Sequence, residues 1–124
     1  GDYQEVSWDQ LKGKGNAGAL DGKKVKILAG FNPRKASPWL PKHKIDAVNY
    51  VAWELRKAGS TQENVPEKIM AYSLIGSPAA LRFNVVGERN ARKNTWTAGL
   101  YVYGTLYAEG TGSYPWSILV EAID

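Results

Sequence analysis

Residues 99–124, GLYVYGTLYAEGTGSYPWSILVEAID, decide the fold of this chain. Over residues 100–109, small and aliphatic side chains alternate with tyrosine, threonine and glutamate. This period of two is typical of a strand with one buried face. The glycine-rich segment 110–113 predicts a turn, and residues 116–123 are a second run rich in strand-forming side chains. We therefore expect two strands, and Gly104 within the first predicts a bulge, a bend or a close approach between backbones.

The first of these predicted strands has two chemically different faces. One face is aliphatic and belongs in a core, whereas the other carries Tyr101, Tyr103 and Tyr107. Such a tyrosine face is suited to stacking on a ligand, but tyrosine is also common in strands because it packs well. Both interpretations remain open, because a helix predicted at residues 45–58 would cover these tyrosines if it packed on them.

Length and composition indicate one globular domain over residues 1–124. Hydrophobic residues make up 44% of the chain and charged residues 23%, which is typical of a folded domain rather than a disordered one. The lack of cysteine excludes disulfides, thiolate metal sites and cysteine catalysis. We expect no transmembrane segment, because no apolar run approaches the ~20 residues that a spanning helix needs.

Basic residues are concentrated in one part of the chain. Residues 12–57 contain eleven Lys and Arg against three acidic residues, a net charge of +8, whereas the rest carries −4. Segregated positive charge predicts a polyanionic partner or an anionic surface. The total of +4 is also what solubility alone requires, so this second interpretation stays open.

Two earlier segments also alternate with a period of two. Residues 23–31 predict a strand whose outer face carries Lys24 and Lys26. Residues 80–87 predict another strand, with Arg82 pointing away from its aliphatic face.

Helices are predicted in three places. Ser7 is suited to cap one or two helical turns. Residues 45–58 follow helical spacing and end in basic residues before a glycine, although alternation in the same run also allows a strand. Residues 66–74 predict a short helix that begins near a proline.

No catalytic template is found in the sequence. The chain lacks GxSxG, HExxH and the glycine pattern of dinucleotide-binding folds. Its one histidine, His43, lies between two lysines and is expected to be a solvated surface residue that cannot form a metal site alone. Trp39, in the same proline-rich loop, is expected to plug the core, and the alternative is a contact residue. We expect no enzymatic activity, no cofactor and no metal.

Aromatic and basic side chains on strands remain as the functional signal. Single-stranded nucleic acid is bound by this combination, because every base offers a π-face and every nucleotide a negative charge. The candidate nucleic-acid-binding residues are Tyr101, Tyr103, Tyr107, Arg82, Lys24, Lys26, Arg89, Arg92 and Lys93. The last three of these belong to a polar connector predicted over residues 87–95.

Residues 22–30 (GKKVKILAG), 99–106 (GLYVYGTL) and 118–123 (ILVEAI) resemble strands of small bacterial OB-fold domains. The resemblance implies a β-rich α+β domain, a small five-stranded OB-like barrel with one or two helices. It fixes no binding residue, because the matched positions are glycines and aliphatic core. Carried onto this chain, it places strands at 23–31, 80–87, 98–109 and 115–123.

The resemblance leaves the topology open. OB-fold domains usually have a helix between their third and fourth strands, and the connector 87–95 is too short for more than a turn or two. The second strand therefore stays unassigned between residues 46–57 and 68–75. One group with this pattern is exported lipoproteins to which nucleic-acid binding is ascribed, which implies a periplasmic or lipid-anchored location.

These observations together predict a non-catalytic binding module. Its expected ligand is single-stranded nucleic acid or another polyanion, bound on the aromatic and basic strand face. The alternative is a protein-interaction or structural module of the bacterial cell envelope that has no nucleic-acid role.

Overall fold

The computed structural model describes residues 2–12, 17–59, 68–93, 99–109 and 115–124. Most of the regular structure in these residues is strand, so the domain is a β-rich α+β fold. In chain order, the elements are β1 (Gln4–Glu5), a 3-10 turn (Trp8–Leu11), α1 (Ala17–Leu20), β2 (Lys24–Ala36), a second 3-10 turn (Pro41–His43), β3 (Tyr50–Lys57), β4 (Ile69–Leu74), α2 (Pro78–Lys93), β5 (Leu100–Tyr107) and β6 (Trp116–Ile123).

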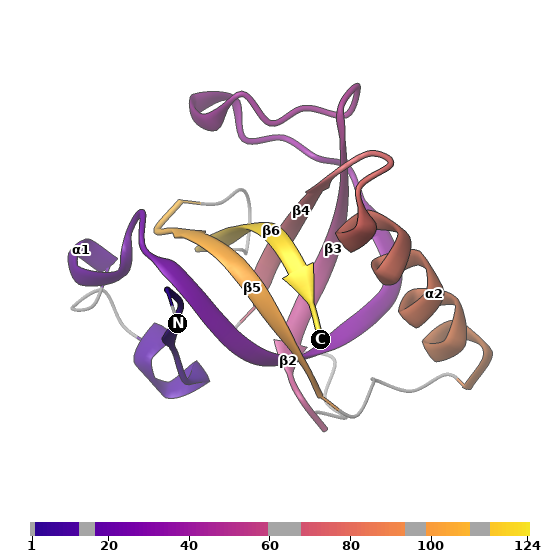
Figure 1. Cartoon of the computed structure of the whole chain (residues 1–124), viewed down its shortest axis with the longest axis horizontal. Coiled ribbons are helices and arrows are strands. Elements are labelled where there is room, and N and C mark those ends of the chain that lie inside the picture. The colour runs from indigo at the N-terminus through magenta and orange to yellow at the C-terminus, as the bar shows by residue number, and fades with distance from the viewer. Residues whose placement is uncertain (1, 13–16, 60–67, 94–98, 110–114) are drawn as a thin grey trace.

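Five strands form a closed barrel, because β2 pairs with both β3 and β5. The order around the barrel is β2-β3-β4-β6-β5, with β4 and β6 parallel and the other neighbours antiparallel. β1 adds a sixth strand parallel to β2. In the chain, α2 lies between the third and fourth barrel strands, so the topology is OB-like. Figure 1 shows the barrel with α2 along one side.

The predicted hairpin closes the barrel. β5 and β6 pair antiparallel, and β5 also pairs with β2 over six residue pairs. The bulge predicted at Gly104 is confirmed, because the β5–β6 register shifts between Tyr103 and Gly104. A Cβ at Gly104 would collide with the backbone carbonyl of Leu119, so the close approach of the two strands requires glycine here.

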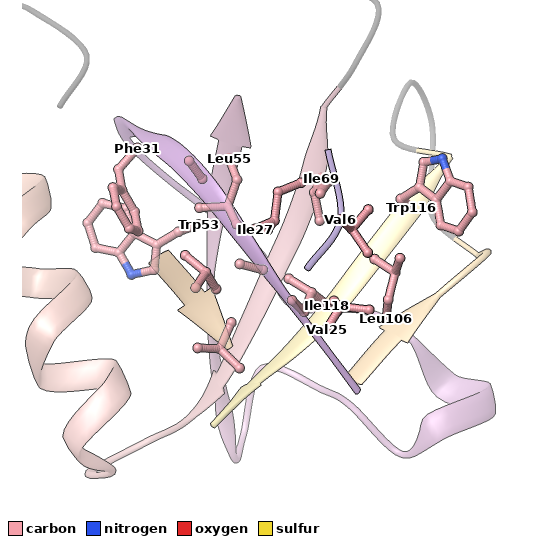
Figure 2. Close-up of a cluster of buried hydrophobic side chains, with 14 of the residues drawn as sticks. Val6, Val25, Ile27, Phe31, Trp53, Leu55, Ile69, Leu106, Trp116 and Ile118 are labelled. Carbon is pink, nitrogen blue, oxygen red and sulfur yellow. The ribbon is translucent and has the colours of Figure 1, made fainter. Parts of the chain in front are cut away.

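The barrel interior is filled by side chains from all five of its strands, as Figure 2 shows. Phe31 and Trp53 lie next to α2, and Trp116 lies at the opposite end of the cluster. The indole N–H of Trp116 donates to the carbonyl oxygen of Leu11 (3.1 Å), which holds the first 3-10 turn against that end. Burial of each large apolar side chain of this kind stabilises the fold by about 1.5–3 kcal/mol.

The helical turn predicted after Ser7 is confirmed. Ser7 and Gln10 form a capping box at the start of the 3-10 turn, with Ser7 N–H donating to the side chain of Gln10 at 2.8 Å. Trp8 and Leu11 on this turn are buried in the core. The segment after β1 is thereby fixed to the barrel.

The strand predicted over residues 80–87 is wrong, because this segment belongs to α2. Ser77 and the proline after it start this helix. The hydroxyl of Ser77 accepts a hydrogen bond from the N–H of Ala80 at 3.2 Å. Buried Phe83 and Val86 follow helical spacing, and Phe83 packs on the rings at the end of the barrel.

The helices favoured over residues 45–58 and 66–74 are also wrong, because β3 and β4 occupy these segments. Alternate side chains of these strands pack on opposite faces of the barrel wall. Trp53 and Leu55 point into the barrel, whereas Ala52 packs in a second cluster outside it. Pairing with a neighbour on each side outweighed the local helical signals. The strand predicted over residues 23–31 is longer than expected, because β2 continues to Ala36 with a register shift in its pairing with β3.

Candidate nucleic-acid interface

The structure brings four of the predicted residues together on the outer face of β2 and β5. Lys26 is directly opposite Tyr103, and Tyr101 follows two residues away on the same face of β5. Lys24 precedes Lys26 on that face of β2, and Tyr3 joins from the segment that leads into β1. We call these five residues the tyrosine–lysine surface.

The rings and cations of this surface contact one another. The Tyr3 and Tyr103 rings meet edge to face at 5.3 Å between centroids, and Tyr103 lies 6.4 Å from Tyr101. The ammonium of Lys24 lies 5.8 Å from the Tyr3 ring centroid, and that of Lys26 lies 5.5 Å from the Tyr101 centroid. These distances are in the range of cation–π attraction. Stacking surfaces and positive charges are thus presented together by a rigid barrel wall.

Two carboxylates hold the tyrosine hydroxyls in place. Tyr101 donates to Glu5 Oε1 at 2.8 Å, and Tyr3 donates to Glu121. These hydrogen bonds raise the pKa of both tyrosines above the ordinary value, because they stabilise the protonated hydroxyl. Lys24 Nζ also lies 3.7 Å from Glu121 Oε1. The carboxylates therefore fix the geometry of the surface but offset its positive charge.

Tyr3 is the residue of this surface that the sequence prediction missed. β1 contains only two residues, which is too short for a period of two to be recognised. The available signal was the spacing of Tyr3 and Glu5, which matches alternation along a strand. No local pattern indicates that this segment pairs with β2.

Tyr107 lies apart from the tyrosine–lysine surface. Its ring stacks on the imidazole of His43, with 3.7 Å between centroids and 17° between planes. Burial is the main cause that raises the pKa of Tyr107. His43 was predicted to be solvated, but it is partly buried in this stack, and its Nε2 lies 3.6 Å from Glu109 Oε1. Tyr107 therefore serves to attach the loop over residues 37–49 to the barrel.

That loop covers part of the outer face of β3 and β4. Leu40 and Ile45 are fully buried on Met70 and Tyr72, so the loop supplies a small second core outside the barrel. Trp39 was expected to plug the core, but 58% of its surface is exposed. Its neighbour Leu40 fills the core position instead.

The predicted basic residues at 82–93 are not on a strand beside the tyrosines. Arg82 and Arg89 are exposed on α2, which packs against β2, β4 and β6. Arg92 and Lys93 end the same helix, and their side chains lie outside the described part of the structure. The predicted placement of this group was wrong, because residues 78–93 form α2 and not a strand followed by a connector.

Among the residues that the structure describes, no three His, Cys, Asp or Glu side chains gather in a way that holds a metal ion. No helix in the same part of the chain is long and apolar enough to span a membrane.

The sequence matches no family model and no curated protein. Among solved structures, the chain is similar to asparaginyl-tRNA synthetase from Pyrococcus horikoshii, determined in complex with asparaginyl-adenylate. The identity is 19% over 86% of this chain, with a TM-score of 0.47. This chain spans 19% of the length of that protein. The fold assignment rests on the strand order and pairing described above.

Proposed function

We propose that this domain binds single-stranded nucleic acid, without catalysis, through the tyrosine–lysine surface. The observation that carries the proposal is the position of two lysine ammonium groups beside tyrosine rings on one barrel face. Bases stack on such rings, and the phosphates between them pair with such cations. A polyanion of this kind also agrees with the excess of basic residues in the first half of the chain.

Preorganisation supports the same proposal. Tyr3 and Tyr101 are held by hydrogen bonds to carboxylates, and Tyr103 is held between their rings. Side chains that are ordered before binding lose less conformational freedom when a ligand arrives. The rings of the tyrosine–lysine surface are therefore already positioned for stacking before the ligand binds.

The carboxylates set the expected strength of binding. Glu121 pairs with Lys24 at 3.7 Å, and Glu5 adds a second negative charge beside Tyr101, so the surface attracts phosphate only weakly. We expect affinity in the range of non-specific binding, about 10⁻⁴ to 10⁻⁶ M. We expect little sequence preference from the rings alone, because every base has a π-face.

A fluorescence titration tests this proposal. Addition of oligo(dT) at low salt should quench tyrosine and tryptophan emission, and added salt should reverse the quenching. Tyr103→Ala should weaken binding by roughly five- to a hundredfold, as expected for the loss of one stacking partner worth about 1–3 kcal/mol. Circular dichroism checks that this variant is folded.

Arg89→Gln provides the matched control. It removes one positive charge from exposed α2, away from the tyrosine–lysine surface, and should change the affinity little. The proposal fails if the wild type shows no quenching at low salt. It also fails if Tyr103→Ala binds as well as the wild type.

A second candidate function is a protein-interaction module, including one of the bacterial cell envelope. Large apolar side chains are exposed near the 37–49 loop and the end of β4, where the N–H of Ile75 donates to Asn49. Exposed apolar groups are typical of protein contacts when they cluster. A specific partner captured in a pull-down that nuclease leaves intact would favour this function. The residues concerned are Trp39, Val48, Leu74 and Ile75.

A further inference from the structure

A cleft of about 320 Å³ lies at one end of the tyrosine–lysine surface. It forms where β1 and β3 meet end to end along β2. β5 takes one edge of β2, so β1 and β3 share the other edge. Pairing with β1 reaches Lys26, and pairing with β3 begins at Ala29. Leu28 lies at this junction and lines the cleft, with 41% of its surface exposed.

The apolar wall of the cleft is held rigidly. Trp8 lines it and is 93% buried, since only 7% of its surface is exposed. The indole N–H of Trp8 donates to the carbonyl oxygen of Leu28 at 2.7 Å, which fastens the turn after β1 to β2. Ala58 adds a small apolar side chain from the end of β3. A planar ring entering the cleft would therefore meet preformed apolar contacts.

The cleft has two carboxylates as acceptors, together with the hydroxyls of Ser7 and Tyr101 and the ammonium of Lys57. Glu5 and Asp9 both line it, and Glu5 already orients the Tyr101 hydroxyl at 2.8 Å. An ionised carboxylate has lone pairs for several hydrogen bonds, so Glu5 can accept from a ligand as well as from Tyr101. Lys57 stands in the wall contributed by β3 and supplies one cation for a neighbouring phosphate.

The cleft is continuous with the tyrosine–lysine surface because Tyr101 belongs to both. We propose that the cleft receives one base of the bound strand. It prefers cytosine or adenine over thymine, because these two bases carry an exocyclic amino group on the edge that faces away from the sugar. This inference rests on the function proposed above. Carboxylates accept hydrogen bonds from the amino group of cytosine, whereas the carbonyl oxygen at the same position of thymine meets them as a second acceptor.

The test compares oligo(dC) with oligo(dT) of equal length by fluorescence titration. For the wild type, we expect oligo(dC) to bind about three- to tenfold more tightly, which corresponds to one added hydrogen bond of ordinary net strength. Glu5→Gln should bring this ratio close to one. The glutamine carbonyl can still accept from Tyr101, so the surface itself is kept, while its amide N–H groups can serve the thymine carbonyl.

Glu121→Gln is the matched control. Glu121 also accepts a tyrosine hydroxyl on this surface, but it does not line the cleft. Its replacement should strengthen binding of both oligonucleotides equally and leave their ratio unchanged. A ratio that falls only in Glu5→Gln supports the inference.

Two results would overturn the inference while leaving the proposed function in place. One is equal binding of both oligonucleotides by the wild type. The other is a wild-type preference that Glu5→Gln leaves unchanged, since the preference then arises outside the cleft. Failure of both oligonucleotides to bind at low salt is a different outcome, and it overturns the proposed function together with the inference.

Discussion

Replacement of Glu121 by Gln is expected to strengthen nucleic-acid binding. In the free protein, Lys24 Nζ lies 3.7 Å from Glu121 Oε1, so this lysine is already paired before a phosphate arrives. The substitution removes the negative charge and leaves a carbonyl oxygen to accept from Tyr3, which keeps the ring in place. Lys24 then becomes fully available to a phosphate.

The magnitude follows from the exposure of this ion pair. Exposed pairs contribute about 0.2–1 kcal/mol, so the gain in affinity should not exceed about fivefold. Each phosphate neutralised on a single strand contributes about −0.7 to the slope of log K against log salt concentration. Release of Lys24 should therefore make the slope for Glu121→Gln steeper than the wild-type slope by about 0.7.

The assay is a series of fluorescence titrations with oligo(dT) at increasing salt. Glu88→Gln is the matched control, because it removes the same charge from exposed α2 and tests for an effect of net charge alone. If Glu121→Gln and the wild type have equal affinities and equal slopes, Lys24 does not contact phosphate and the reasoning is refuted. An equal gain in Glu88→Gln would refute it as well, since the effect would then be global.

Three further predictions concern stability. Gly104→Ala should lower the free energy of unfolding, measured by urea denaturation, by about 1–3 kcal/mol, because its Cβ meets the Leu119 carbonyl, whereas Gly18→Ala, with open space at its Cβ, should cost nothing. Ser77→Ala should cost about 1 kcal/mol by thermal melting, because α2 loses its cap; no change would contradict this start of the helix. Because its pKa is raised, Tyr101 stabilises the folded state fully at pH values below the ordinary pKa of 10.0. This stabilisation is lost as the pH rises through the raised pKa, so Tyr101→Phe should reduce the alkaline loss of stability.

The closing hairpin could be predicted from the sequence because its information is local. Alternation over β5 marks the buried face, and Gly104 marks the bulge without any knowledge of the partner strand. The same holds for the start of β2, where lysines alternate with aliphatic residues. These segments carry a period of two that no competing helical signal obscures.

The middle of the chain could not be predicted because its signals conflict. In β3, helical spacing and alternation coexist, and the choice was made by pairing with β2 and β4. In α2, Ser77 and the following proline signal either an end or a beginning, and the contact of Phe83 with Phe31 decides for a helix. Tertiary contacts therefore settled what local propensity left balanced.

The residues of the candidate site also differ in whether local sequence signals predict their positions. Lys24, Lys26, Tyr101 and Tyr103 lie on correctly predicted strand faces, and barrel closure brings the two faces together. Tyr3 joins them through a two-residue strand, whose pairing is set by the fold and not by its own sequence. The arginine candidates lie elsewhere than predicted, because the strand and the connector to which they were assigned form α2.

The most direct test of the central claim is chemical-shift mapping of backbone amides by NMR during titration with oligo(dT). The proposed interface predicts that the largest changes follow the two paired strand segments, residues 24–28 and 101–105, with smaller changes near Tyr3. Changes confined to α2 or to the loop over residues 37–49, with these strands unaffected, would contradict it.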